Sequence, residues 1–201
     1  MYLAARQLEF GDIPAEHRAS LAKIANFVKD QYQEKLPARL LFVCTHNSRR
    51  SHLAQIWTAA AASYYQLPIP LVYSGGTEST AFNPRAVAVL ERTGMKIQKT
   101  TGDENPIYHV RFSDDGSVIT AFSKVINQAP NPKKDFCAVM VCDSADKSCP
   151  SVSGAIARVA LPYVDPKQSD DTPDESRTYD ERSRQIAREM LYVMSLVRAA
   201  N

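Results

Sequence analysis

One stretch of the sequence combines residue types that can bind and attack a small oxyanion: Cys44-Thr45-His46-Asn47-Ser48-Arg49-Arg50-Ser51. Five residues separate Cys44 from Arg50, and a loop of that length can curl until its backbone N–H groups converge on one tetrahedral anion. The planar guanidinium of Arg50 can then hold two of the anion's oxygens. Positive surroundings favour the thiolate of cysteine, which is its nucleophilic form. The segment, here called the Cys44 loop, therefore predicts a nucleophile at the base of an anion-binding site.

The other residues of the Cys44 loop have supporting roles in this interpretation. Ser51, at the start of the following helix, can donate a hydrogen bond to the Cys44 thiolate, and Asn47 can hold the loop because it tolerates a left-handed backbone. In the alternative interpretation Cys44 is a buried apolar residue and the two arginines are surface charges. The apolar strand before the loop and the helix after it favour the first interpretation. The predicted oxyanion-binding residues are Thr45, His46, Asn47, Ser48, Arg49 and Arg50.

Two further cysteines and one aspartate carry the remaining candidate chemistry. Cys142 and Cys149 have six residues between them, Asp143 to Ser148. Such a pair suits thiol-disulfide exchange, although Cys142 could instead belong to the core and Cys149 to an ordinary loop. A zinc site is disfavoured, because the spacing is too long and no histidine is nearby in the sequence. Asp165, followed by proline, could protonate a leaving oxygen and then activate water, or simply form a turn.

The elements around the Cys44 loop indicate a parallel α/β sheet. Apolar residues at helical spacing predict a helix over residues 13 to 36, and the continuous apolar run Leu40 to Val43 predicts a buried strand. A helix over 51 to 65, a strand over 71 to 73 and a helix over 83 to 92 continue a β-α-β-α order. That order predicts parallel strands joined by right-handed crossovers.

The second half of the chain adds a hairpin and completes the sheet. Alternating apolar residues on either side of the turn Asp114-Asp115-Gly116-Ser117 predict a β-hairpin within 107 to 126. Strands over 136 to 141 and 155 to 161, a polar loop over 167 to 176 and a helix over 178 to 198 follow. Cys137 falls inside an apolar strand and is expected to be a structural thiol.

These elements predict an α/β fold of three layers, α/β/α, around a four-stranded parallel sheet. We expect one domain over residues 1 to 201, in which residues 1 to 37 are a helical extension and 107 to 126 an inserted hairpin.

Composition limits the partners of the chain. The 201 residues include 24 basic and 22 acidic side chains, so the net charge of +2 favours neither nucleic acid nor an anionic membrane as a partner. No apolar run approaches the roughly 18 residues of a membrane-spanning helix, and the N-terminus lacks a signal-peptide pattern. We therefore expect a cytoplasmic protein, whose four cysteines are kept reduced and available for chemistry.

The sequence from about Leu40 to Arg198 resembles the low-molecular-weight protein tyrosine phosphatase superfamily, which includes the thioredoxin-coupled arsenate reductases. Besides the Cys44 loop, the similar segments are Tyr73-Ser74-Gly75-Gly76-Thr77-Glu78, Asn83-Pro84-Arg85-Ala86 and Asp165-Pro166. The segment from Cys142 to Pro150 resembles the reductases, which also have Ala-Asp between two redox cysteines and proline after the second.

The resemblance implies a reaction sequence with no cofactor. Cys44 attacks arsenate held by the loop amides and Arg50, and Cys142 then attacks Cys44 and releases arsenite. Cys149 attacks Cys142 in turn, and thioredoxin reduces the final disulfide on a flexible loop. In a phosphatase of this superfamily, Asp165 would act as the general acid and water would resolve the covalent intermediate.

Several positions depart from the reductase pattern. Arg49 stands where another cysteine is common, and His46 replaces a usual glycine. Gln55 stands where reductases that bind a monovalent cation have glutamate, which weakens the expectation of such a site. The positions that match that cation site are Asn47, Ser74, Thr101 and Asp103.

Three functions follow from these observations. The first is thioredoxin-coupled arsenate reduction, and the second is hydrolysis of phosphotyrosine or a small phosphate ester. The phosphatase branch often has aromatic residues after Asp-Pro, whereas Lys167 follows here. The third function is oxyanion binding or redox sensing without turnover, which would not require Asp165.

Overall fold

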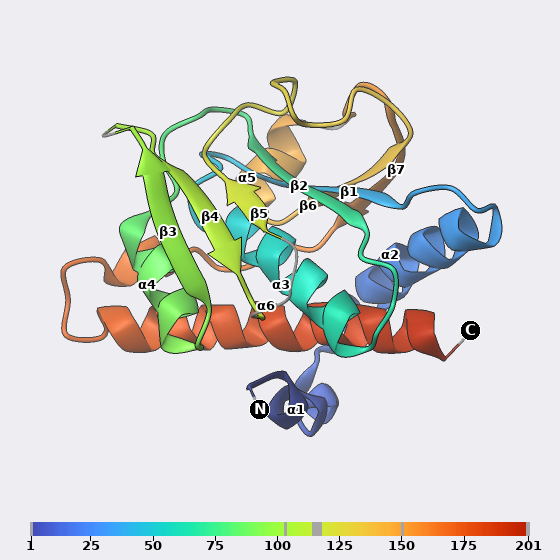
Figure 1. The fold of residues 1–201 in the computed structure, drawn as a ribbon, viewed down its shortest axis with the longest axis horizontal. Helices are drawn as coiled ribbons and strands as arrows, with labels where there is room; N and C mark the ends of the chain where they lie inside the picture. The colour runs from blue at the N-terminus through green and yellow to red at the C-terminus, as the bar shows by residue number, and fades with distance from the viewer. Residues whose placement is uncertain (1, 103, 114–117, 150, 200–201) are drawn as a thin grey trace.

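A four-stranded parallel sheet forms the centre of the computed structural model (Figure 1). The structure describes residues 2–102, 104–113, 118–149 and 151–199, apart from the side chain of Thr101. The strands lie in the order β2 (Leu71–Gly76), β1 (Arg39–Cys44), β6 (Phe136–Met140) and β7 (Ala155–Ala160). The inner strands β1 and β6 are almost entirely buried, which explains why their sequences are continuous apolar runs. The predicted α/β class and four-stranded parallel sheet are confirmed.

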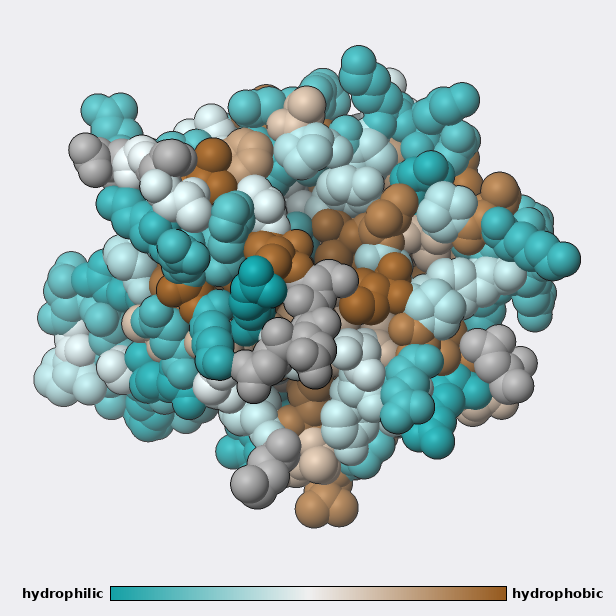
Figure 2. Space-filling view, in the orientation of Figure 1, coloured by the Kyte–Doolittle hydropathy of each residue, from teal (hydrophilic) through white to brown (hydrophobic). Residues whose placement is uncertain are grey.

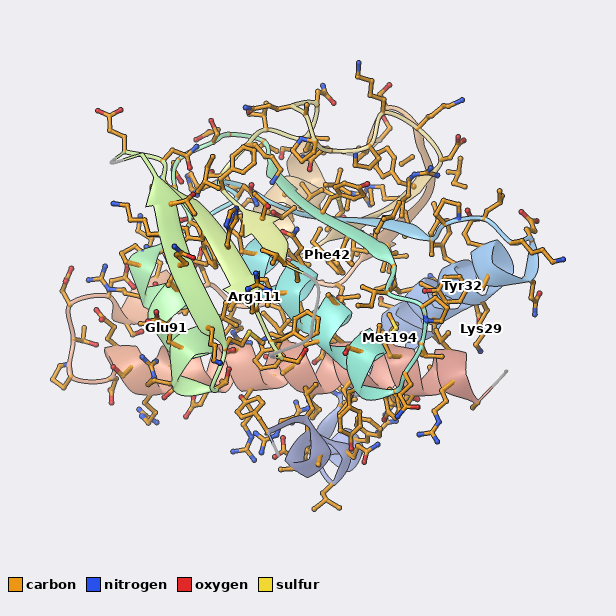
Figure 3. The ribbon with its side chains drawn as sticks, viewed as in Figure 1. Lys29, Tyr32, Phe42, Glu91, Arg111 and Met194 are labelled. Atoms are coloured by element: carbon orange, nitrogen blue, oxygen red, sulfur yellow. The ribbon has the colours of Figure 1, made fainter. Side chains whose placement is uncertain are left out.

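Helices cover this sheet and bury its apolar side chains. α2 (Ala15–Gln33) contacts β6 and β7, and α3 (Arg50–Tyr64) contacts β1 and β2. The long helix α6 (Glu175–Arg198) packs against both of them and against α4 (Pro84–Arg92). Figure 3 shows Phe42 of β1 and Met194 of α6 in this interior, where both side chains are fully buried. α4 begins as predicted, since Asn83 caps its N-terminus and proline occupies its first turn.

The predicted hairpin is part of a second sheet. β4 (Ile107–Arg111) and β5 (Ile119–Ala121) pair antiparallel, as expected, with the turn 114–117 lying outside the described residues. A third strand that the sequence analysis missed, β3 (Lys96–Thr101), pairs with the other side of β4. The sequence Lys-Ile-Gln-Lys-Thr-Thr has one strongly apolar residue, so its pattern gives little strand signal. The hairpin is therefore two strands of a three-stranded antiparallel sheet.

Four further elements correct the predicted boundaries. The N-terminal extension has a short helix α1 (Tyr2–Gln7) and a 3₁₀ turn η1 (Phe10–Asp12) before α2. The polar segment after β6 forms the helix α5 (Asp143–Ser148) rather than a loop. The predicted loop over 167 to 176 begins with the 3₁₀ turn η2 (Pro166–Ser169) and runs into α6, which starts at Glu175. No helix among the described residues is long and apolar enough to cross a membrane.

Candidate active site

The Cys44 loop connects the end of β1 to the start of α3, at the carboxyl edge of the parallel sheet. The Cys44 side chain is buried, and its Sγ lies 3.1 Å from the hydroxyl oxygen of Ser51. The Asn47 side chain donates a hydrogen bond of 2.8 Å to that same hydroxyl oxygen. Since the Ser51 oxygen accepts from Asn47, its own proton is free to point at the sulfur. This arrangement suits stabilisation of a Cys44 thiolate.

Asn47 also fixes the shape of the loop. Its backbone adopts a positive φ of 43°, as the sequence analysis expected of an asparagine in this turn. Its side chain is fully buried, and Oδ1 accepts a 2.9 Å hydrogen bond from the backbone N–H of Lys124. Gly76 of β2 packs so closely beneath the loop that a Cβ there would lie 2.6 Å from the carbonyl oxygen of Thr45. The loop is therefore held from below by a glycine and from the side by residue 124.

Arg50 and Asp165 meet at the loop, although 115 residues separate them in the sequence. The Arg50 guanidinium donates to Asp165 Oδ2 at 2.6 Å and to the carbonyl oxygen of Tyr163 at 2.9 Å. The other carboxylate oxygen of Asp165 accepts from the backbone N–H of Lys167 and caps η2. The structure thus brings a carboxylate to the same place as the nucleophile and the arginine.

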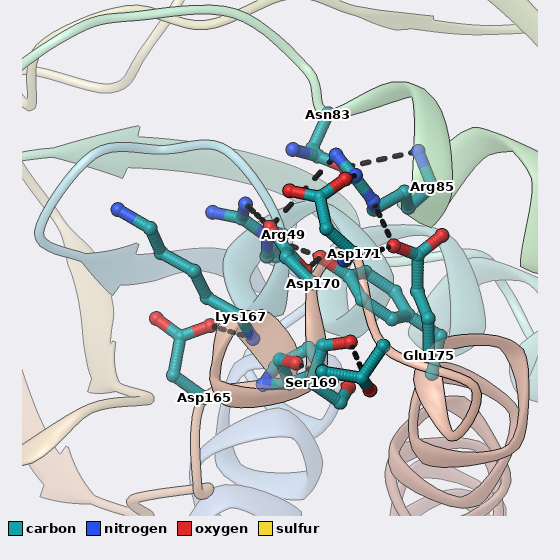
Figure 4. Close-up of polar contacts among 12 residues, drawn as sticks. Arg49, Asn83, Arg85, Asp165, Lys167, Ser169, Asp170, Asp171 and Glu175 are labelled. Carbon is teal, nitrogen blue, oxygen red and sulfur yellow. Dashed lines mark hydrogen bonds and ion pairs between the residues drawn. The ribbon is translucent and has the colours of Figure 1, made fainter.

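The Arg49 side chain points elsewhere, into a polar cluster on the far side of the loop (Figure 4). Its guanidinium donates to the hydroxyl of Tyr179 at 2.6 Å and to Asp170 Oδ2 at 2.9 Å. The Tyr179 hydroxyl donates in turn to Asp170 Oδ1 at 2.8 Å. Asp170 pairs the charge of the Arg49 guanidinium, as Asp165 pairs that of Arg50, but the two side chains turn toward different carboxylates. The expectation that Arg49 contributes to oxyanion binding stays a prediction.

The other loop residues present backbone groups to the site. His46 is the most exposed, with its ring 3.7 Å from Glu78 Oε2, while its carbonyl oxygen accepts from Ser123 and Thr80. The carbonyl oxygen of Ser48 accepts from the backbone N–H of Asn83. These bonds fix the positions of the loop carbonyls. They leave the His46 ring on the solvent side of the site.

The second cysteine lies at the end of the strand next to β1. β1 and β6 pair in parallel, with Val43 opposite Met140. Cys44 is the last residue of β1, and Cys142 lies two residues beyond the end of β6, so the two cysteines lie at neighbouring strand ends. The Cys142 side chain is buried, and its Sγ lies 3.5 Å from the hydroxyl oxygen of Thr45. No disulfide joins any of the four cysteines, all of which lie among the described residues.

Cys149 lies at the opposite end of α5 from Cys142. The sulfur of Cys142 accepts from the backbone N–H of Ala145 and caps the start of the helix, while Cys149 ends it. Arg158 of β7 holds this end, since its guanidinium donates to the carbonyl oxygen of Cys149 and to Asp146. The expectation of a flexible loop for Cys149 is wrong for this structure, because the segment is helical and tied to β7.

Cys137 behaves as the sequence analysis expected. It is fully buried within β6, and burial raises the pKa of its thiol to about 12. A thiol with that pKa is inert toward electrophiles at neutral pH.

The candidate cation positions already have protein partners where the structure describes them. Asn47 Oδ1 accepts from residue 124, and the Ser74 hydroxyl lies 3.2 Å from the ring Nδ1 of His52. Asp103 and the Thr101 side chain lie outside the described residues. Within the described residues, no group of three or more His, Cys, Asp or Glu side chains could hold a metal ion.

Two buried basic residues behind the loop were not singled out by sequence reasoning. His52 follows Ser51 on α3 and is fully buried, and burial holds the pKa of its ring well below the ordinary value. Burial also lowers the pKa of the Lys124 ammonium group to about 8. The one sequence signal for Lys124 is its position among the apolar residues Phe122, Val125 and Ile126.

Known proteins similar to this chain fall into two groups. An arsenate reductase of Bacillus subtilis is 29% identical over 145 residues, which are 72% of this chain and 86% of that protein. An arsenate reductase of Bacillus anthracis is 28% identical over 149 residues, which are 74% and 91% of the two chains. No model of a known protein family matches the chain.

Solved structures with a similar fold are low-molecular-weight phosphatases. The protein tyrosine phosphatase from T. tengcongensis has a TM-score of 0.52 at 18% identity and covers 82% of this chain and 99% of its own. The phosphotyrosine phosphatase from Vibrio cholerae O395 has a TM-score of 0.51 at 14% identity, with 79% and 94% covered. At these identities the likeness concerns the fold.

Proposed function

We propose that this chain, which is similar in sequence to arsenate reductases and in fold to low-molecular-weight phosphatases, is an enzyme that reduces arsenate to arsenite. The observation that carries the proposal is the position of Cys142, whose sulfur lies beside Thr45 of the Cys44 loop. A hydrolase of this fold needs no second thiol there. A reductase does, because the electrons must come from a pair of thiols.

The first step is attack of the Cys44 thiolate on arsenate. The backbone N–H groups of residues 45 to 50 and the guanidinium of Arg50 hold the oxyanion, in a site that the Ser51 hydroxyl and the start of α3 make favourable to negative charge. Asp165, beside Arg50, protonates the oxygen that leaves as water. The product of this step is a covalent bond between Cys44 Sγ and arsenic.

The second step is reduction. The Cys142 thiolate attacks Cys44 Sγ, and the sulfur–arsenic bond breaks with its electron pair passing to arsenic. Arsenic falls from the +5 to the +3 state and leaves as arsenite, while the two sulfurs form a disulfide. The adjacency of the β1 and β6 strand ends supports this exchange.

The third step replaces the disulfide between Cys44 and Cys142 with one between Cys142 and Cys149. Cys149 attacks Cys142 and releases the Cys44 thiolate, and an external dithiol of the thioredoxin class reduces the new disulfide. Seven residues of helix span about 10 Å, whereas the Cα atoms of a disulfide lie at most about 7 Å apart. α5 must therefore unwind for this step, and the proposal places the enzyme in a reducing compartment such as the cytoplasm.

A phosphatase is the second candidate. Cys44, Arg50 and Asp165 converge as that reaction requires, and the similar folds include phosphatases. The exposed surface after Asp165 lacks an aromatic pair to hold a phosphotyrosine ring, since Lys167 and Gln168 follow Pro166. We rank reduction first for this reason and because of Cys142.

One experiment separates the two activities. Arsenate-dependent oxidation of thioredoxin and hydrolysis of an aryl phosphate are measured in the parent, in Cys142→Ser and in the matched buried control Cys137→Ser. We expect Cys142→Ser alone to lose arsenate turnover. Full turnover in Cys142→Ser would rule out the relay, hydrolysis without reduction would favour the phosphatase, and neither activity in the parent would favour a binding or sensing module.

A further inference from the structure

A cavity of about 330 Å³ lies behind the Cys44 loop, between the outer strand β2 of the parallel sheet and β5 of the antiparallel sheet. Figure 2 shows hydrophobic side chains gathered on this face of the molecule. Ile69 and Leu71 on one side of the cavity are 39% and 43% exposed, so its wall is open to solvent. The apolar residues that line it are Ile69, Pro70, Leu71, Val72, Val118, Ile119 and Pro130.

Lys124 also lines this cavity, and its side chain is only 2% exposed. Its ammonium group donates to the carbonyl oxygen of Phe122 at 3.2 Å and lies 4.6 Å from the centre of that ring. Among the described residues no carboxylate pairs with it, and none lines the cavity. With a pKa of about 8, the amine is still mostly protonated at pH 7. A buried charge without a partner is costly, so the cavity favours an anion beside Lys124.

A second buried polar residue lies beside the same cavity. Gln55 of α3 is 4% exposed and lines the cavity. Its amide nitrogen donates to the carbonyl oxygen of Val72, and its side chain also interacts with the buried ring of His52.

We propose that this cavity binds a small carboxylate with an apolar body, whose carboxylate pairs with Lys124 while its hydrocarbon lies along Ile69, Leu71 and Ile119. One lysine supplies one positive charge, which matches a monoanion. The apolar walls disfavour inorganic phosphate or arsenate, because such ions would lose hydration without gaining enough donors. The site is separate from the Cys44 thiol and does not depend on the proposed reaction.

The backbone of Lys124 connects this site to the Cys44 loop. Its N–H donates to Asn47 Oδ1, and its carbonyl oxygen accepts from the N–H of Gly76 at 2.9 Å. A ligand that pairs with the Lys124 side chain therefore lies next to the residue that holds Asn47. Amide resonances of residues 47, 76 and 124 are suitable reporters of binding.

The test is a titration of the full chain with hexanoate, followed by amide NMR, with 1-hexanol and inorganic phosphate as comparison ligands. We expect saturable shifts along β2, β5 and residue 124 with hexanoate. In Lys124→Met, which keeps an apolar stem, hexanoate affinity falls by about tenfold or more while hexanol binding stays unchanged. Lys134→Met is the matched control, since that side chain is 83% exposed, and it should bind hexanoate as the parent does.

A second variant guards against misfolding of the first. Ile119→Glu places a carboxylate in the cavity wall, where it can pair with Lys124 and exclude hexanoate. The proposal is overturned if the parent does not bind hexanoate, if phosphate binds in its place, or if Lys124→Met binds hexanoate as tightly as the parent.

Discussion

The two cysteine-bearing segments of the site are held in different ways. Buried contacts fix the Cys44 loop on several sides: Asn47 bonds to Ser51 and to residue 124, and Gly76 packs against its backbone. The segment from Cys142 to Cys149 is a six-residue helix, capped by a thiol and tied by Arg158. The first segment is rigidly held, as the proposed anion site requires, whereas the second must change shape if its cysteines are to join. In the proposed reaction, anion binding and electron transfer make opposite demands on rigidity, and the two segments lie at neighbouring strand ends.

The largest effect on activity is expected from a substitution in the Cys44 loop. In Arg50→Lys the planar fork that can hold two oxygens is lost, while the positive charge is kept. We expect kcat/KM to fall by about 10²- to 10³-fold for arsenate and for an aryl phosphate alike. Steady-state kinetics with both substrates check this. A loss confined to one substrate would contradict the role of the Cys44 loop as the common binding site.

A change in the segment from Cys142 to Cys149 should separate arsenate reduction from aryl phosphate hydrolysis. In Cys149→Ser the disulfide between Cys44 and Cys142 has no resolving thiol, so we expect about one arsenite per protein molecule and then no further turnover. Aryl phosphate hydrolysis, if present, should be unchanged. Quantifying arsenite in the presence of thioredoxin measures the stoichiometry. Sustained turnover would show that Cys149 is not the resolving residue.

The Arg158→Gln variant tests whether α5 is less stable than the Cys44 loop. The variant removes the guanidinium bonds to Asp146 and to the carbonyl oxygen of Cys149. We expect faster hydrogen exchange of the α5 amides with no change at residues 44 to 51. The loss in free energy of unfolding should be within about 1 kcal/mol, since the pair is partly exposed. Equal protection of both segments in parent and variant would contradict the idea that α5 is the less stable one.

The smallest effect is expected from a buried carboxylate that contacts Tyr163, two residues before Asp165. The buried carboxylate of Glu189 accepts from the Tyr163 hydroxyl and lies 2.9 Å from His17 Nδ1, and this hydrogen bond raises the pKa of His17. Because the folded-state pKa lies above the unfolded value of about 6.5, the stabilisation is complete below that pH and is lost as pH rises through the folded pKa. Denaturant unfolding from pH 5 to 8 should therefore show a decline with pH that His17→Gln removes. An unchanged slope in the variant would exclude His17 as its source.

The sequence predicted the strand, loop and helix around Cys44 well because their signals are local. A continuous apolar strand, a cysteine, an arginine six positions later and a helix start all lie within a dozen residues. The parallel sheet followed from the same kind of short-range pattern.

Other features depend on partners far away in the sequence. Arg49 turns toward Asp170 and Tyr179, which lie 121 and 130 residues away, so its departure from the loop has no local signal. The helix α5 was missed because serine and aspartate dominate it and a cysteine caps it, which is not one of the usual capping residues. The burial of Lys124 depends on how the two sheets meet.

The central claim is that Cys142 attacks Cys44, and disulfide mapping tests it most directly. Cys149→Ser is mixed with one equivalent of arsenate, the free thiols are blocked, and the linked peptides are identified by mass spectrometry. We predict a disulfide between Cys44 and Cys142, with Cys137 recovered as a free thiol. Arsenite release with Cys142 still free, or no disulfide at all, would contradict the account.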